Sequence, residues 1–321
     1  MTQLLGRGLG TGAGRASSPY GWSLVALAGM LVLNSLLGPL LLGVVDYPIS
    51  ASMTNQLLGL EVVTLVLVVP WAAMAGALAL RQDPRAPLLA LGPTTYAAYM
   101  FVQYVLGPEY GTYSWVVLFH VAIVALSGGL ALLAWSKAQR QPVPSISDNQ
   151  RRRLSLMLAG LAVFVLVRYL PAFSGAVGQD SIAAEFRDAR TFFWSIVLLD
   201  LAVVVPLTAA AALALLRDTP VGHRALYGVV GWFALVPPSV TAMAAVMLVR
   251  DDPHASVSTL LLLAMATLVF WAVAGGVLGR LVRGGARPAP GSTGQRRPRP
   301  GTQSRTRRPK DPMHPAPRGV Q

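Results

Sequence analysis

Eight apolar segments, each long enough to cross a lipid bilayer, constrain this chain more than any other feature. A helix needs about 20 mostly apolar residues to span the hydrocarbon core, which is about 30 Å thick. The segments lack strict two-residue alternation, which disfavours a transmembrane barrel. We therefore predict an all-α fold, a polytopic transmembrane helix bundle with eight spans near Trp22–Val45, Leu57–Leu80, Ala86–Leu106, Tyr113–Trp135, Leu154–Phe173, Phe192–Leu216, Ala225–Val249 and Val257–Val282. The third segment is the most polar of the eight.

The composition supports a membrane protein and excludes several kinds of site. Only 12% of the residues are charged and 54% are hydrophobic, whereas a typical soluble domain is about 25% charged. The chain has no cysteine, so it forms no disulfide, thiolate nucleophile, iron–sulfur cluster or Cys-ligated zinc site.

The basic residues alternate from loop to loop, which predicts an orientation. Of the 26 Lys and Arg residues, 22 lie in the two terminal segments and the even-numbered loops, and three lie in the other loops. Those other loops hold seven acidic residues. Because basic loops remain in the cytoplasm, both termini are predicted to be cytoplasmic. The chain has 24 arginines and two lysines, typical of a GC-rich bacterial genome, so we expect a bacterial plasma membrane.

Three regions follow from these patterns. Residues 1–21 form a flexible cytoplasmic leader, residues 22–283 the eight-helix domain, and residues 284–321 a basic tail rich in proline and arginine. The tail has too few apolar side chains to form a core and is expected to be disordered. Anionic lipid headgroups are its expected partners, because it leaves the membrane on the cytoplasmic face. Binding of nucleic acid is disfavoured.

Two stretches of the chain resemble each other at a constant offset of 136 residues. Pro70 aligns with Pro206, Arg81 with Arg217 and Pro84 with Pro220. One interpretation is a 4+4 parallel internal repeat, with its axis along the membrane normal. The other is convergent Ala- and Val-rich composition. Pro70, Pro206 and the pair Pro237–Pro238 are expected to kink or break their helices.

Three charged side chains lie within the predicted spans: Glu61, Arg168 and Asp200. Each charge costs about 2.5–3.5 kcal/mol at the centre of a span, so each requires an explanation. Arg168 and Asp200 lie at one depth on consecutive spans, which predicts an ion pair. The pair is interpreted either as a ligand site or as a structural clamp. Glu61 either belongs to a polar site or reaches headgroup water about one turn away.

Gln103 and His120 also lie in the outer half of the predicted bundle, with the hydroxyls of Tyr99, Tyr104 and Tyr169 at similar depths. The inner half is almost entirely Leu, Ala and Val. This asymmetry predicts a polar cavity that opens to the outside. His120 has a second interpretation as a hydrogen-bonded core histidine, and Asn34 is expected to join helices.

No enzyme signature is present among the motifs that carry a mechanism: neither H-E-x-x-H, nor G-x-S-x-G, nor a Walker loop. We therefore expect no catalytic residue, no metal site and no cofactor. Haem held by two histidines is disfavoured, because His223, His254 and His314 all lie outside the spans.

The run from Asp200 to Pro206, D-L-A-V-V-V-P, is followed by R-D-T-P-V-G at 217–222, and Tyr96, Tyr99 and Tyr104 lie within residues 92–104. These short motifs resemble a family of uncharacterised bacterial eight-span integral membrane proteins, over spans three to seven. The resemblance implies the fold and no activity.

Three hypotheses about function remain. The first is binding or transport of a small or lipidic ligand through the outward-facing cavity, at Glu61, Gln103, His120, Arg168 and Asp200. The second is a non-transporting membrane subunit or scaffold. The third is an intramembrane enzyme that acts on a lipid-linked substrate, for which an acid, a histidine and an arginine would supply acid–base groups.

Overall fold

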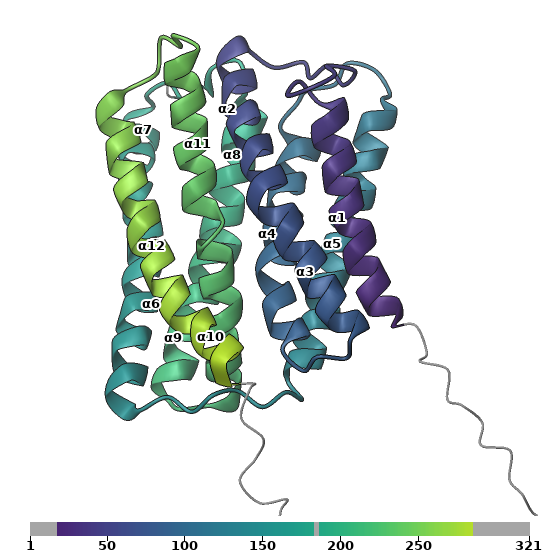
Figure 1. Ribbon diagram of the computed structural model, residues 1–321. Coiled ribbons are helices and arrows are strands. Elements are labelled where there is room, and N and C mark those ends of the chain that lie inside the picture. Colours follow the sequence, from purple (N-terminus) through teal and green to yellow (C-terminus); the bar gives the residue numbers. More distant parts are fainter. Residues whose placement is uncertain (1–17, 183–185, 285–321) are drawn as a thin grey trace, which may run out of the picture. The chain divides into compact units, whose positions relative to one another are not determined.

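The computed structural model describes residues 18–182 and 186–284, and within them every regular element is helical (Figure 1). The expected leader, apart from residues 18–21, and the expected tail from residue 285 onward lie outside these ranges. Eleven of the helices are α1 Pro19–Leu37, α2 Ala51–Val63, α3 Val69–Leu80, α4 Ala86–Leu106, α5 Trp115–Ala138, α6 Asp148–Arg168, α7 Leu170–Gly178, α8 Arg190–Leu199, α9 Val205–Leu216, α10 Pro220–Phe233 and α11 Val236–Val249. The last is α12 Val257–Gly284, and two π-helical segments, η1 Thr64–Val68 and η3 Asp200–Val204, join α2 to α3 and α8 to α9.

Seven continuous helical stretches are long and apolar enough to cross a membrane, which agrees with a polytopic helix bundle. They are Pro19–Leu37, Ala51–Leu80, Trp115–Ala138, Asp148–Gly178, Arg190–Leu216, Pro220–Val249 and Val257–Arg283. Helix α4, the expected third span, is not among them. Most of its residues are buried, and it packs against α3, α5, α8 and α10. A helix that other helices surround needs less apolar surface than one that faces lipid. That α4 crosses the membrane as an eighth span therefore remains a prediction.

The ends of two predicted spans differ from the structure. Helix α1 ends at Leu37 instead of Val45, because Gly38 is extended, with ψ −177°, and precedes Pro39, which disfavours helical geometry in the residue before it. Helix α2 begins at Ala51 instead of Leu57, with the Ser50 hydroxyl accepting from the Met53 amide. Several of the first six residues of α2 are polar, so hydropathy alone placed the start of the span too late.

The expected helix break is present at Pro237–Pro238, whereas the helices continue through Pro70 and Pro206. Pro70 and Pro206 are each the second residue after a π-helical segment. Helix α10 ends at Phe233 and α11 begins at Val236, so the helix is interrupted just before Pro237. Proline lacks the amide that would continue the hydrogen-bond ladder.

Four features of the two halves recur at the offset of 136. They are the π-helical segments at 64–68 and 200–204, the following helices at 69–80 and 205–216, the second-position prolines, and the positive φ of 57° at Gln82 and 56° at Asp218. The first and fifth spans differ, since α6 continues into α7 while α1 ends at Gly38. The repeat therefore stays a prediction for the chain as a whole.

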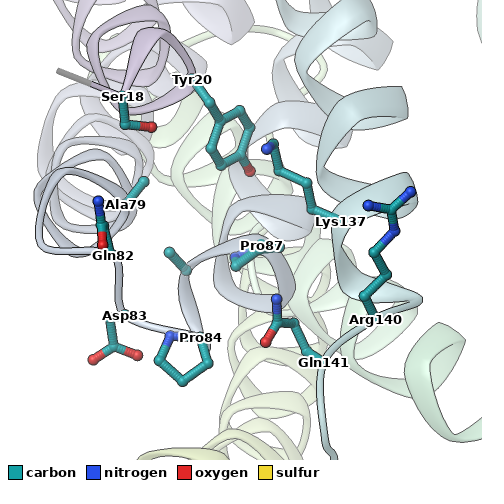
Figure 2. A pocket seen from close by; sticks show the side chains of 11 residues that line it. Ser18, Tyr20, Ala79, Gln82, Asp83, Pro84, Pro87, Lys137, Arg140 and Gln141 are labelled. Carbon is teal, nitrogen blue, oxygen red and sulfur yellow. The ribbon is translucent and has the colours of Figure 1, made fainter. Parts of the chain in front are cut away.

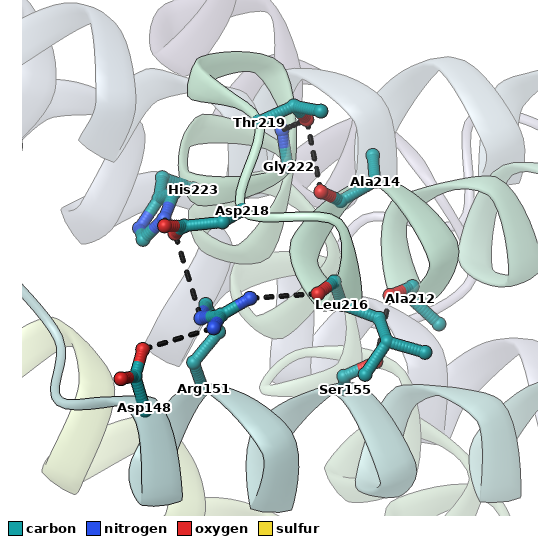
Figure 3. Close-up of polar contacts among 10 residues, drawn as sticks. All are labelled: Asp148, Arg151, Ser155, Ala212, Ala214, Leu216, Asp218, Thr219, Gly222 and His223. Atoms are coloured by element: carbon teal, nitrogen blue, oxygen red, sulfur yellow. Dashed lines mark hydrogen bonds and ion pairs between the residues drawn. The ribbon is translucent and has the colours of Figure 1, made fainter.

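Polar contacts at one end of the bundle join the loops that carry basic residues. Arg151 donates to the Leu216 carbonyl at 2.7 Å and lies 3.5 Å from Asp218 (Figure 3). Arg224 donates to the carbonyls of Ala138 and Gln141. Arg85 donates to the carbonyl of Val282. The α3–α4, α5–α6 and α9–α10 connections and the end of α12 therefore meet at one end, the basic end.

The opposite end is held by an acidic loop residue. Asp252, between α11 and α12, accepts from the Asn55 side-chain amide at 2.9 Å and from the Ser52 hydroxyl at 3.2 Å. Burial raises the pKa of Asp252, but these two hydrogen bonds and one from the His254 amide lower it by more, so the pKa is lower than usual. The loop is thereby tied to the first turns of α2.

Candidate functional site

Two carboxylic acids are buried at the same depth, one in each half of the chain. Glu61 lies ten residues after the first residue of α2, and Asp200 lies ten residues after the first residue of α8. Ten residues of helix correspond to about 15 Å, so each acid lies about 15 Å along its helical stretch from that first residue. Their exposed fractions are 1% and 4%.

Both acids adjoin a π-helical segment, where the regular hydrogen-bond ladder of the helix changes. Glu61 precedes the η1 segment by one turn, and Asp200 is the first residue of η3. Such π-bulges recur at functional sites. The two acids are therefore placed at the points where their helices are least regular.

Glu61 is buried, and neither carboxyl oxygen makes a hydrogen bond of good geometry among the described residues. The Leu40 amide, in the turn after α1, is a neighbouring donor that contacts the carboxyl group only weakly. Its carboxyl group lies against the turn that follows α1, where a Cβ added to Gly38 would be 2.5 Å from Oε1. Glycine at this position leaves the space that the carboxyl group occupies. Because α2 begins six residues earlier than expected, Glu61 lies further from the start of its helix than the sequence predicts, and it is covered by other side chains in this conformation.

His120 is fully buried and links α5 to α1. Its Nε2 atom lies 2.9 Å from Asn34 Oδ1 and 3.4 Å from the Tyr47 hydroxyl. The rings of Tyr47, Phe101 and Tyr104 surround the imidazole, with centroids 5.2–5.9 Å away. This geometry matches the interpretation of a hydrogen-bonded core histidine, and Asn34 joins two helices as expected.

Asp200 forms the centre of a second cluster, which joins three helices. The hydroxyls of Tyr99 on α4 and Tyr169 after α6 donate to its two carboxyl oxygens, each at 2.6 Å. Arg168 Nη2 lies 3.5 Å from Asp200 Oδ2 and donates to the Tyr169 hydroxyl at 3.2 Å. The ion pair that the sequence predicts is present, but the two tyrosines make the shorter contacts.

Arg168 occupies the rim of this cluster. Its side chain is 50% exposed, while that of Asp200 is 5% exposed. The guanidinium lies 5.1 Å from the centroid of the Tyr169 ring, in a cation–π arrangement. Arg168 therefore covers Tyr169 and Asp200 from one side.

The five predicted site residues fall into separate groups. Arg168 and Asp200 lie together, and His120 belongs to the group with Asn34 and Tyr47. Gln103 is buried, and its backbone carbonyl accepts from the Gly107 amide at the end of α4. The sequence did not predict the contact between Tyr47 and His120. Tyr47 lies in the connection after α1, and no sequence pattern indicated that this connection packs against α5.

No group of three or more His, Asp or Glu side chains within residues 18–182 and 186–284 is placed to hold a metal ion.

Two pockets of the bundle lie away from these five residues. One, of about 380 Å³, is at the basic end between α1, the α3–α4 turn and the end of α5. The other, of about 210 Å³, is apolar and lies beside the α10–α11 break, with Trp71 and Trp271 in its wall. The outward-facing polar cavity stays a prediction, because Glu61, Gln103, His120 and Asp200 are covered by other side chains in this conformation.

Comparison with known proteins assigns no relative: no family model matches the chain, and neither a curated protein nor a solved structure is detectably similar to it.

Proposed function

We propose that this polytopic membrane protein binds a small or lipidic ligand at the buried polar side chains of its outer half, and carries it across the membrane without covalent chemistry. The observation that carries the proposal is Glu61, a carboxylic acid that is 1% exposed and makes no hydrogen bond of good geometry within the described part of the chain. An ionisable group at this depth is costly. The carboxyl group packs against the turn after α1 but makes no hydrogen bond of good geometry among the described residues, so its oxygens remain open to a ligand that donates to them.

The helices that carry the acids have the features that movement would need. Each acid lies at or one turn before a π-helical segment, and a proline is the second residue after that segment. Many transporters place their substrate and ion sites where helices unwind near the membrane midplane, and these two helices, although continuous, are irregular beside each acid. The acids are covered in this conformation, so the predicted outward-facing cavity would be a second arrangement, in which α2 and α8 bend at these segments.

Within this proposal, Glu61 carries the coupling proton. A carboxyl group can bind a proton in one arrangement and release it in the other, and a ligand with a hydrogen-bond donor would replace the proton as its partner. His120 and Asn34 would hold the connection after α1 closed over Glu61. Asp200 already accepts hydrogen bonds from Tyr99 and Tyr169, and would hold α4 and the end of α6 together while the protein changes conformation.

The proposal includes an orientation. The basic loops meet at one end of the bundle, and basic loops stay in the cytoplasm. We place this end, with both termini, in the cytoplasm, in a bacterial plasma membrane.

Ligand binding is tested by thermal unfolding of the purified full chain in detergent, against a panel of short-chain lipids and small polar solutes. A ligand of the proposed site raises the unfolding midpoint of the wild type but not of Glu61→Gln. Glu109→Gln is the matched control, because Glu109 is an exposed loop acid and Thr191 is the one side chain within the described residues that donates a hydrogen bond to it. Stabilisation that survives both Glu61→Gln and Asp200→Asn would place binding elsewhere.

Transport of a ligand found in this way is then measured in proteoliposomes under an imposed pH gradient. The proposal predicts uptake that follows the gradient and is lost in Glu61→Gln. Uptake retained after neutralisation of both Glu61 and Asp200 would contradict proton coupling at these acids.

A second candidate, a non-transporting subunit or scaffold, has one observation in its favour. Asp200 has both oxygens hydrogen-bonded by tyrosines from other helices, which is the arrangement of a structural clamp. Co-purification of one stoichiometric partner under mild detergent, together with failure of every solute or lipid to stabilise the chain, would favour this candidate.

A further inference from the structure

The pocket at the basic end is the feature that the proposed function does not use. It has a volume of about 380 Å³, which is within the range of small-ligand sites, about 300–1,000 Å³. Its wall combines the start of α1, the turn between α3 and α4, and the end of α5 (Figure 2). These elements come from three separate stretches of the first half.

Two cationic side chains of the wall have no acidic partner. Lys137 and Arg140 lie near the end of α5, and no hydrogen bond or ion pair of either side chain is found among residues 18–182 and 186–284. The Lys137 ammonium lies 5.4 Å from the centroid of the Tyr20 ring. Figure 2 shows Lys137 extending toward Tyr20 across one side of the pocket.

The acid in the wall is neutralised by an arginine outside it. Asp83 receives hydrogen bonds from Arg85 Nε at 2.9 Å and Nη2 at 2.6 Å. The hydrogen bond from Arg85 lowers the pKa of Asp83, so Asp83 is ionised and paired at neutral pH. Lys137 and Arg140 therefore give the pocket a net positive charge.

A buried donor without a partner also faces the pocket. Tyr20 is 8% exposed, and its hydroxyl has no hydrogen-bond partner in the described structure. Figure 2 shows this hydroxyl at the pocket, beside Lys137. A buried hydroxyl without a partner is unfavourable, and a ligand with acceptor oxygens would accept a hydrogen bond from it.

In the second half, the basic side chain at this end of the bundle is bound by other residues of the chain. There the start of α6 meets the α9–α10 turn, and Arg151 is bound by its own chain: it donates to Asp148 and Leu216 and lies beside Asp218 (Figure 3). His223 completes this network with a 2.7 Å contact to Asp218. Arg151 therefore has acidic partners, whereas Lys137 and Arg140 have none within the described ranges.

We propose that the pocket formed by Tyr20, Gln82, Pro84, Lys137, Arg140 and Gln141 binds a phosphate group, carried by an anionic phospholipid or by a soluble phosphate ester. Lysine and arginine give charge-assisted hydrogen bonds to phosphate oxygens, and the tyrosine hydroxyl adds a neutral donor. The basic end lies at headgroup level if it faces the cytoplasm, where anionic lipids concentrate. This site is separate from the ligand site proposed around Glu61.

Three probes distinguish the sources of the phosphate. Purified full-length protein in neutral detergent is titrated with dioctanoyl phosphatidylglycerol, with glycerol 3-phosphate, and with dioctanoylglycerol, and the unfolding midpoint is recorded. We expect saturable stabilisation by one or both phosphate probes and none by dioctanoylglycerol. Stabilisation by the lipid alone identifies a headgroup site, and stabilisation by glycerol 3-phosphate identifies a site for soluble esters.

Variants test whether this pocket is responsible. The double change Lys137→Gln and Arg140→Gln should weaken the apparent affinity about tenfold or more, since each basic residue contributes about 1 kcal/mol toward an anionic headgroup. Lys137, Arg140, Arg152 and Arg153 are all exposed, but Arg152 and Arg153 do not line the pocket. Arg152→Gln with Arg153→Gln therefore removes the same charge outside the pocket and should leave the affinity unchanged.

Tyr20→Phe keeps the ring and removes only the hydroxyl, so it should weaken binding in a chain that still folds. The proposal is overturned if neither phosphate probe stabilises the protein, or if the two double variants lose affinity equally.

Discussion

At the scale of single residues, the two buried acids differ in what surrounds them. Asp200 has two tyrosine donors and a nearby arginine, while Glu61 makes no hydrogen bond of good geometry in the part of the chain that the structure describes. A buried polar group that loses its partner costs more than the partner's own bond contributes. Changes around Asp200 should therefore affect stability, and changes at Glu61 should affect binding.

The tyrosines, more than Arg168, should account for the stability of the Asp200 cluster. Tyr99→Phe should lower the free energy of unfolding by about 1.5–3 kcal/mol, because it removes a hydrogen bond to a charged acceptor. Tyr20→Phe is the matched control and should be neutral or stabilising in the absence of ligand, since it removes a buried hydroxyl that is unpaired within the described residues. Equal losses in the two variants, measured by denaturant unfolding in detergent, would contradict the assignment.

A double-mutant cycle on Arg168 and Asp200 separates the ion pair from the tyrosine contacts. Asp200→Leu should destabilise strongly, Arg168→Leu weakly, and the double variant should stay destabilised because the hydroxyls of Tyr99 and Tyr169 remain without an acceptor. Recovery of stability in the double variant would show instead that the ion pair alone is the clamp.

How much the sequence predicted also differs between residues. The depth of Arg168 and Asp200 followed from counting residues along their spans, so their contact was foreseeable. Tyr99 and Tyr169 were foreseeable only as hydroxyls at a similar depth, because side-chain direction depends on how helices rotate against one another. The pocket at Lys137 was not foreseeable, since it needs the ends of three helices to meet.

At the scale of elements, close contacts between helices depend on glycines that the sequence does not distinguish from others. A Cβ on Gly59 of α2 would overlap the backbone of Ala242 and Met243 on α11, whereas a Cβ on Gly129 of α5 would meet nothing within 4 Å. Both glycines lie inside helices. Small residues allow such close approach in membrane bundles.

Gly59→Ala should therefore separate α2 from α11 and lower the unfolding midpoint clearly. Gly129→Ala should be neutral or stabilising by up to about 1 kcal/mol, because alanine favours the helix. The comparison is made by thermal unfolding of both variants in the same detergent. Equal midpoints for the two variants would show that α2 and α11 leave room for a methyl group at position 59.

The loop between α11 and α12, which contains Asp252, should become less stable in acid. The folded-state pKa of Asp252 is lowered, so its contribution is present above the unfolded value of about 3.9 and is lost as the pH falls through the folded-state value. Asp252→Asn should be less stable than the wild type at pH 7, and the difference should shrink toward pH 3. Asp188→Asn, at an exposed position, controls for general charge. A difference that is constant with pH would contradict this role.

At the scale of the whole molecule, hydropathy identified seven helices that can cross a membrane, and burial explains why α4 differs. Its neighbours cover it on several sides, so its residues face protein more than lipid. It runs from Arg85, which contacts Val282 at the basic end, to Gly107, which lies against Phe192 at the start of α8. Helix α4 therefore passes from one end of the bundle to the other.

The absence of cysteine from the chain allows a direct test of this crossing. Single cysteines at Arg81 and Ser145 should be protected from a membrane-impermeant maleimide in intact cells, while one at Thr112 should be labelled. This pattern follows if α3, α4 and α5 each cross. Labelling of positions 81 and 112 from the same side would show that α4 does not cross.

The central claim, that Glu61 is kept for binding and Asp200 for structure, is tested most directly by one pair of variants in lipid nanodiscs. Glu61→Met and Asp200→Met replace each buried acid with the same apolar side chain, and the free energy of unfolding is measured for both. We predict that Glu61→Met equals or exceeds the wild type, because it removes a costly group without breaking a hydrogen bond of good geometry. Asp200→Met should lose stability, because two tyrosine hydroxyls lose their acceptor. A loss in Glu61→Met as large as that in Asp200→Met would show that Glu61 stabilises the fold, and would contradict the account.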